Sequence, residues 1–158
     1  MSHFGRAVPI TCRSFPRLDM HTLTGDRKLF VPSSESLSHI VLLFKSSQVH
    51  QLASWLPLFR SLPCSSQLVF VLSPSWRLLH PLWRRRCDQW RASELPGIAD
   101  SQVAAVYVDR KTLLESLGLL NPEITNLVLR GQDIECAWQG ERRPQSQAEV
   151  VNAIKQLV

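Results

Sequence analysis

The stretch HIVLLF at residues 39–44 decides the fold, because it is a nearly continuous apolar run that ends at the polar residues 45–47 (KSS). A short run without polar alternation predicts a strand that is covered on both faces. After it, apolar residues recur at helical spacing: Val49, Leu52, Trp55, Leu56, Phe59 and Leu62. The sequence therefore predicts a buried strand that leads into an amphipathic helix, which is kinked by Pro57.

Two more buried strands and a short helix are predicted in the middle of the chain. Residues 67–72 (QLVFVL) and 103–108 (VAAVYV) are short apolar runs rich in β-branched residues. Asp109 follows the second run, and its carboxylate can accept hydrogen bonds from the amides of a first helical turn. Gly118 tolerates the left-handed conformation that ends many helices, so a short helix is predicted between these two residues.

The last third of the chain predicts a hairpin and a closing helix. Residues 125–130 and 134–138 have strand patterns, and the three residues that join them are few enough to force an antiparallel pairing. Residues 146–149 (SQAE) form a capping box, so the closing helix is expected to begin there. Alternating strands and helices predict a mostly parallel sheet with helices on both faces, to which the hairpin adds an antiparallel edge. Such a mixed α/β sheet has the wiring of a thioredoxin-like domain of the redoxin type.

The chain of 158 residues has room for one hydrophobic core. We expect residues 1–14 to be a basic N-terminal arm and residues 15–158 to be a single domain, with an Arg/Trp-rich helical insert at residues 73–99. Residues 1–18 contain three Arg and no acid, a composition typical of a mitochondrial targeting segment or of a solvated basic tail. No apolar run approaches the ~20 residues that a membrane-spanning helix needs.

In thioredoxin-like enzymes the first central strand runs into a C-x-x-C motif at the start of a helix, where the helix dipole and the free amides stabilise a thiolate. Here Val49 and Leu52 fall at the two sulfur positions. Neither side chain can attack or form a disulfide, so these are predicted to be degenerate thiol positions without dithiol chemistry. His50 lies beside the helix start and has no nucleophile next to it in sequence.

The cysteines are far apart in sequence and form neither a C-x-x-C motif nor a zinc-ligand pattern. A lone Cys is more often a small buried apolar residue than a nucleophile. The sequence therefore predicts no catalytic residue, no metal site and no cofactor. The four cysteines are Cys12, Cys64, Cys87 and Cys136.

The insert at residues 73–99 combines tryptophan with arginine at spacings that suit an amphipathic helix. It has three interpretations: a cover helix whose Trp side chains fill the core, a docking face for a protein partner or an anionic membrane surface, and a nucleic-acid contact. Three adjacent Arg residues alone support the nucleic-acid interpretation only weakly. The candidate partner-binding residues are Trp76, Trp83, Arg84, Arg85, Arg86 and Trp90.

Residues 43–48 (LFKSSQ), 116–121 (SLGLLN) and 137–140 (AWQG) resemble segments of the mitochondrial ATP synthase assembly factors that act on the membrane sector of that enzyme. The similarity covers roughly residues 15–158, and that family also carries a basic, Trp-bearing insert. The resemblance implies a thioredoxin-like, non-redox protein on the matrix side of the mitochondrial inner membrane. It also implies a role in the incorporation of a hydrophobic proton-channel subunit.

The favoured function is therefore a non-enzymatic assembly factor or chaperone for the membrane sector of mitochondrial ATP synthase, which binds a hydrophobic subunit and makes peripheral contact with an anionic membrane. One alternative is a permanent structural subunit of a large mitochondrial complex, either ATP synthase or the mitoribosome. Another is a one-cysteine thiol peroxidase that uses Cys64 or Cys87. Nucleic acid is the least favoured partner.

Overall fold

The computed structural model of the chain describes residues 6–7, 14–22, 26–30, 37–44, 48–60, 66–72, 85, 89, 103–106, 109–119, 121–140 and 144–157. In these ranges the strands form one eight-stranded sheet with the order β1-β8-β7-β4-β5-β6-β2-β3. The strands are β1 (Arg6–Ala7), β2 (Asp19–Thr22), β3 (Arg27–Leu29), β4 (Leu37–Leu43), β5 (Ser66–Leu72), β6 (Val103–Val106), β7 (Thr125–Arg130) and β8 (Asp133–Gln139). The helices are α1 (Val49–Arg60), α3 (Arg110–Leu117) and α4 (Pro144–Leu157).

Strand β4, which contains most of the HIVLLF stretch, lies at the centre of the sheet. All seven of its residues are buried, because other elements cover both of its faces. It pairs in parallel with β5 and antiparallel with β7. β6 continues the parallel half, and β8 continues the antiparallel half as the second strand of a hairpin. The predicted mixed sheet with its C-terminal hairpin and helix is therefore confirmed. The expectation of a mostly parallel sheet is wrong, because only two of the seven strand pairings among the described residues are parallel.

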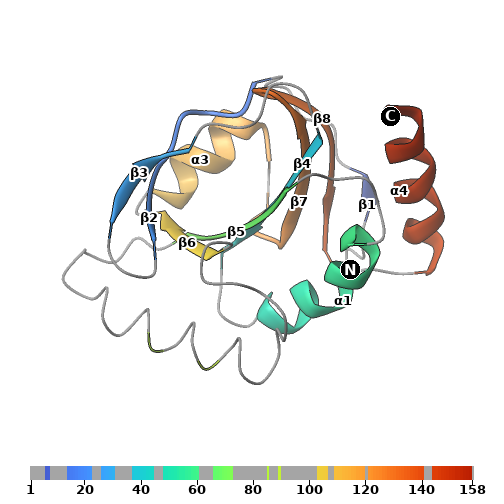
Figure 1. Ribbon diagram of the computed structural model, residues 1–158, viewed down its shortest axis with the longest axis horizontal. Coiled ribbons are helices and arrows are strands. Elements are labelled where there is room, and N and C mark those ends of the chain that lie inside the picture. The colour runs from blue at the N-terminus through green and yellow to red at the C-terminus, as the bar shows by residue number, and fades with distance from the viewer. Residues whose placement is uncertain are drawn as a thin grey trace.

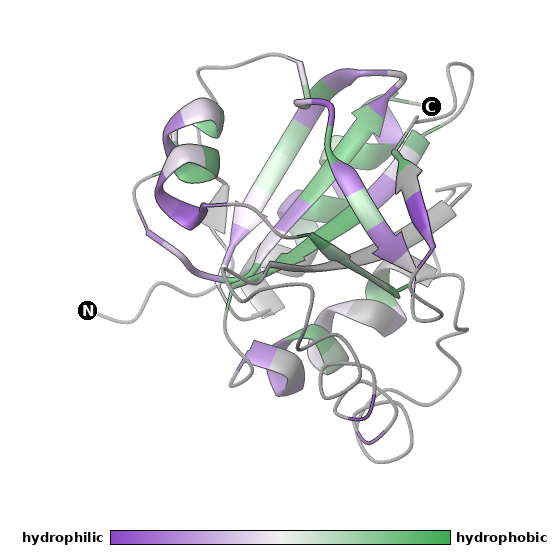
Figure 2. Cartoon of the chain, turned by 90° about the vertical axis from the view of Figure 1, so that its left-hand side faces the viewer, coloured by the Kyte–Doolittle hydropathy of each residue, from purple (hydrophilic) through white to green (hydrophobic). Residues whose placement is uncertain are grey.

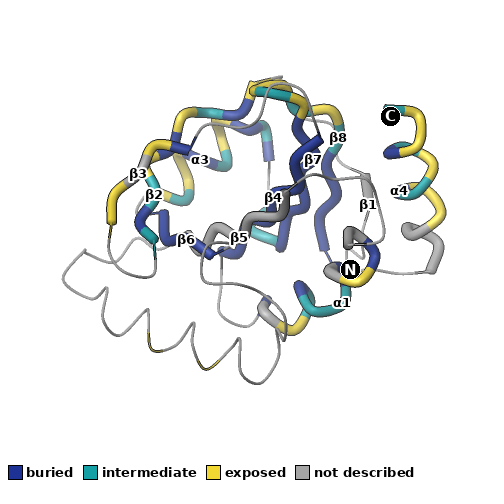
Figure 3. Tube along the Cα trace, viewed as in Figure 1, coloured by how far each residue is buried: buried dark blue, intermediate teal, exposed yellow. Residues whose placement is uncertain are grey.

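Helices cover both faces of the sheet, as the sequence predicts (Figure 1). α1 and α4 pack on one face, where Leu52 and Ile154 join the inward side chains of β4 and β7. α3 packs on the opposite face through Leu113 and Leu117. β4 and β6 are mostly apolar (Figure 2) and buried, while α3 and α4 turn their exposed residues outward (Figure 3). The core is thus divided by the sheet into two layers.

The capping residues of α3 predict both of its ends correctly. The predicted capping box does not mark the start of α4. Asp109 accepts a hydrogen bond from the Thr112 amide, and Gly118 has the left-handed φ of 72°, so the predicted limits of this helix are confirmed. α4 begins at Pro144 and not at the capping box, so that prediction is wrong. Proline is favoured at a first helical position because it needs no amide partner there.

Three short strands near the N-terminus were not predicted. β2 and β3 form an antiparallel pair that extends the sheet beyond β6. Arg6 and Ala7, which fall in the predicted basic arm, form β1 and pair with β8. Phe15 and Phe30 are buried and meet edge to face, with ring centroids 5.8 Å apart, on the same side of the sheet as α3.

A β-bulge interrupts the hairpin. Val128 lies opposite Cys136 and Leu129 lies opposite Ile134, so Glu135 is an extra residue on β8. The bulge moves Ile134 and Cys136 to opposite faces of the sheet, although they are two positions apart in sequence and would share a face in a regular strand. Ile134 packs against the core layer on the α3 side, and Cys136 packs against the layer beneath α1 and α4.

Candidate functional site

The structure places the two degenerate thiol positions at the head of α1, where the carboxyl end of β4 meets the helix. Val49 is the first residue of α1. Leu52 lies one turn further on, is fully buried, and packs in the core beside Trp55. A thiol of a redoxin has to reach its substrate from this turn. The Leu52 side chain instead fills the protein interior.

Gln48 ties the head of α1 to two other segments. Its Oε1 accepts a hydrogen bond from the Phe44 amide at 2.9 Å. Its Nε2 donates to the carbonyl oxygen of Pro122 at 2.7 Å. The side chain is buried, so these bonds satisfy polar groups in a place with little access to water. Sequence reasoning gave Gln48 no role, and its position directly before the first helical residue was the available signal.

A second glutamine holds the same turn from the sheet side. Gln139 donates from Nε2 to the Asn121 carbonyl and to the Thr125 hydroxyl oxygen, both at 3.0 Å. Thr125 in turn donates to the Glu123 carbonyl at 2.9 Å. Gln48 and Gln139 therefore donate hydrogen bonds to two neighbouring carbonyl groups of the turn at residues 121–125. We call this arrangement the glutamine clasp. The peptide bonds of the described residues, Pro122 included, show no cis isomer.

Trp55 fixes the middle of α1 to the end of β8. Its indole Nε1 donates to the carbonyl oxygen of Gly140 at 2.8 Å, and the side chain is fully buried. The amide of Gly140 donates to the Ile124 carbonyl at 2.9 Å. Gly140 has a φ of 90°, a conformation that glycine adopts without a steric penalty. The helix, the turn and the hairpin are consequently joined by a set of hydrogen bonds.

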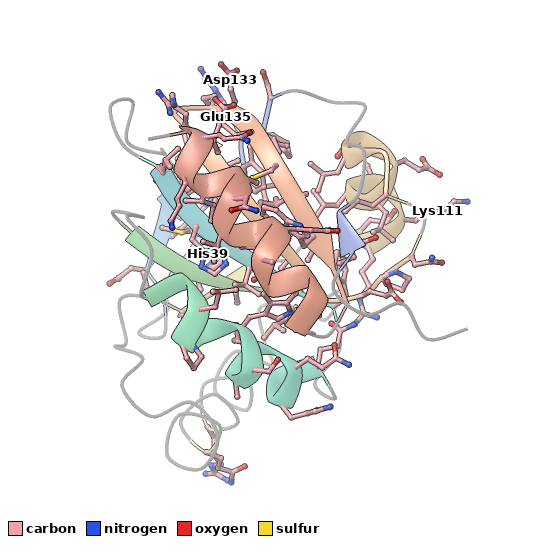
Figure 4. The ribbon with its side chains drawn as sticks, turned by 90° about the vertical axis from the view of Figure 1, so that its right-hand side faces the viewer. His39, Lys111, Asp133 and Glu135 are labelled. Carbon is pink, nitrogen blue, oxygen red and sulfur yellow. The ribbon has the colours of Figure 1, made fainter. Side chains whose placement is uncertain are left out.

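The interior also contains His39, on the face of the sheet that α1 and α4 cover (Figure 4). It is fully buried, and its Nε2 lies 2.9 Å from Oδ1 of Asn126. Burial lowers the pKa of His39 to about 4, although the hydrogen bond to Asn126 acts in the opposite direction. His39 is therefore a neutral structural side chain at pH 7.

The described residues hold little of the predicted partner-binding set. Arg85 and Gln89 are helical and exposed, and residues four positions apart share one side of a helix. Cys136 is half-buried on β8 and packs against the core. Within the described ranges, no three His, Cys, Asp or Glu side chains are grouped as metal ligands, and no helix is both long and apolar enough to cross a membrane. Outside those ranges lie Trp76, Trp83, Arg84, Arg86 and Trp90, together with Cys12, Cys64 and Cys87.

Comparisons with known proteins identify the fold. No family model and no curated protein matches the sequence. A peroxiredoxin-like protein from Aquifex aeolicus is 15% identical with a TM-score of 0.56, and the match covers 98% of this chain and 90% of that one. A DsbE thiol:disulfide interchange protein from Chlorobium tepidum is 10% identical with a TM-score of 0.60, over 92% of this chain and 95% of that one.

BsSco, a member of the Sco family of cytochrome c oxidase assembly proteins, is 6% identical with a TM-score of 0.57, over 94% of this chain and 95% of that one. Identities this low show the fold alone. The sheet order, the two helical layers and these three matches agree with one another. The chain has a thioredoxin-like fold of the redoxin type.

Proposed function

We propose that this chain is a non-redox assembly factor for the membrane sector of mitochondrial ATP synthase, which works on the matrix side of the inner membrane by binding a hydrophobic subunit. The observation that carries the proposal is Leu52, an aliphatic side chain that is sealed in the core at a position where a redoxin needs sulfur. Val49 at the other sulfur position cannot supply a thiol either. What remains for such a domain is recognition of a partner.

The segments that resemble the ATP synthase assembly factors converge in the structure, which supports the proposal. Gln48, Asn121 and Gln139 come from three different segments, and all of them contribute to the glutamine clasp. A likeness carried by scattered surface residues would have no such reason to converge. BsSco, which belongs to a family of assembly proteins, provides a precedent for the fold in the assembly of a respiratory complex.

The insert is the proposed contact surface. Its two described residues, Arg85 and Gln89, are both polar and exposed, which supports this assignment. Arg and Trp are enriched among the side chains that contribute most to binding, and both suit the interface of an anionic membrane. We therefore expect the partner to combine apolar surface with acidic groups or lipid phosphates.

The test replaces Arg84, Arg85 and Arg86 by Glu in the full chain. Because this reverses the charge of the contact surface, association with cardiolipin-containing vesicles in flotation, and with ATP synthase membrane subunits in pull-downs, should fall at least ~10-fold. The control variant carries the same change in net charge at Arg17→Glu, Lys111→Glu and Lys155→Glu. These three residues are exposed and lie outside the insert. Equal association of both variants and the wild type would remove the proposal.

A permanent subunit would bind the same complex, and the timing of its association separates the two functions. An assembly factor co-purifies with early intermediates and is absent from the mature enzyme. Quantitative mass spectrometry of intermediates and of mature complex measures this directly. Equimolar presence in the mature complex would favour a resident subunit.

A further inference from the structure

The outer edge of β8 is covered by the N-terminal residues at two separate places. At one end, β1 pairs with Trp138 and Gln139 (Figure 1). At the other end, Ser14 makes an isolated antiparallel bridge with Asp133. Both pairings lie on the side of β8 that faces away from β7. β1 itself contributes only two residues to the sheet.

These two pairings belong to different registers. The chain advances seven positions from Ala7 to Ser14, whereas β8 advances five positions between their partners Trp138 and Asp133. An antiparallel ladder uses one residue of each strand at every step, so no unbroken ladder can join the two pairings. The sequence between them also contains Pro9, which has no amide hydrogen to donate. A ladder in the register of β1 therefore cannot reach Ser14 unless two residues bulge out, whereas an added segment can follow β8 in a single register.

Charge indicates what kind of segment fits this edge. Asp133 and Glu135 are exposed on β8 and lie near each other at one end of the molecule (Figure 4). The Arg130 guanidinium is 3.8 Å from the Glu135 carboxylate, so it offsets part of the negative charge. Residues 1–18, which include both of these pairings, are basic, with three Arg and no acid. An extended segment that carries Arg or Lys complements the edge in the same way.

We propose that the outer edge of β8 is an interaction surface for an extended, basic segment of a partner protein, which displaces β1 and adds a continuous strand to the sheet. Backbone hydrogen bonds along β8 supply the affinity, and the carboxylates of Asp133 and Glu135 select a cationic segment. This surface contains no residue of the insert at residues 73–99. The inference therefore goes beyond the proposed function and does not depend on the identity of the client.

The test removes the register mismatch from the full chain. Deletion of Val8 and Pro9 lets the N-terminal residues pair with β8 without a break, so the edge becomes permanently filled. The probe is a fluorescein-labelled peptide with the sequence of residues 2–16 and Cys12 replaced by Ser, and its binding is followed by fluorescence anisotropy. We expect the wild type to bind the peptide and the deletion variant to bind at least ~10-fold more weakly. Pro9→Ala, which keeps the two-residue excess, is the matched control and should bind like the wild type.

Hydrogen exchange of the wild type gives a second readout that does not require any variant to fold. Saturating peptide should slow the exchange of amides in β8 and accelerate exchange in β1. Absence of peptide binding to the wild type, equal binding by the deletion variant, or unchanged exchange in β8 would each overturn the inference. A wild-type dimer that the deletion variant does not form would identify a second copy as the occupant and would also overturn it. The Glu variant of Arg84, Arg85 and Arg86 should keep its affinity for the peptide, so this result and the test of the proposed function can fail independently.

Discussion

A single buried imidazole shows how position sets the chemistry of a side chain. His39 would titrate near pH 6.5 in an unfolded chain, and burial lowers its pKa to about 4 in the folded protein. Between these two pH values, His39 is consequently neutral in the folded protein and protonated in the unfolded chain. Because Nε2 is also engaged with Asn126, the role of the ring is to complete the interior rather than to transfer protons.

The free energy of unfolding should therefore depend on His39 in acid. Its contribution is complete above pH 6.5 and is lost as the pH falls from 6.5 towards 4, by up to about 3 kcal/mol. Urea unfolding at several pH values measures this directly. His39→Leu should flatten the pH dependence of the free energy of unfolding in this window. A wild-type curve that is level between pH 6.5 and 4 would show that this assignment is wrong.

Gln48 gives the second prediction at this scale. Gln48→Ala removes the partners of the Phe44 amide and the Pro122 carbonyl, and unsatisfied buried groups are costly. We expect the free energy of unfolding to fall by about 1–3 kcal/mol. Gln156→Ala, at an exposed position on α4, is the control and should change it by less than about 0.5 kcal/mol. If both variants unfold at the same denaturant concentration, the clasp does not stabilise the protein.

At the scale of elements, the inner strands and the helices could be predicted because each has a strong local pattern. β4 is entirely apolar except for Ser38 and His39, and α3 carries its own caps. β2 and β3 have no such pattern, since β2 has one buried residue among four and β3 is the tripeptide RKL. They form strands because β6 offers them a sheet edge. Their pairing is a tertiary effect that local sequence does not encode.

The candidate site could be predicted only in part, for a related reason. Its missing thiols are visible at Val49 and Leu52 in the sequence. The glutamine clasp is not visible, because Gln48 and Pro122 are 74 residues apart and meet only when the sheet has formed. Amide side chains are common on protein surfaces, so nothing in composition marks these two glutamines as buried.

The β-bulge allows a prediction about the hairpin. Deletion of Glu135 restores a regular ladder, with Ile134 and Cys136 on their present faces, so stability should change by less than about 1 kcal/mol. Deletion of Ala137 slips the register and moves the Trp138 side chain away from its core layer, which should cost more than about 3 kcal/mol. Thermal unfolding of the two variants compares them. Equal losses would mean that Glu135 is not the extra residue.

At the scale of the whole molecule, the chain keeps the architecture of redoxins at 15% identity or less while the first turn of α1 carries no sulfur. The scaffold needs only buried apolar strands and two helical layers, and many sequences meet those needs. The chemistry needs particular atoms at one helix start. A sequence can therefore keep the fold after it has lost the thiol groups that the reaction needs.

We expect the purified protein to lack thiol-dependent catalysis. It should neither accelerate the reduction of insulin by dithiothreitol nor consume hydrogen peroxide above the buffer rate, because the helix start carries no thiolate. The Cys64→Ser, Cys87→Ser double variant is the matched control and should behave identically. Peroxide consumption by the wild type that disappears in the double variant would establish the one-cysteine peroxidase instead.

The glutamine clasp also has a consequence for protein engineering. Cysteines installed at positions 49 and 52 would follow Gln48 directly in sequence, and the carbonyl groups of Asn121 and Pro122 already accept hydrogen bonds from Gln139 and Gln48. A substrate polypeptide would meet carbonyl groups that already accept hydrogen bonds. A design that restores reactivity should therefore also replace both glutamines by shorter side chains. Restoring a dithiol at this helix start therefore involves the polar contacts of the glutamine clasp as well as the two sulfur positions.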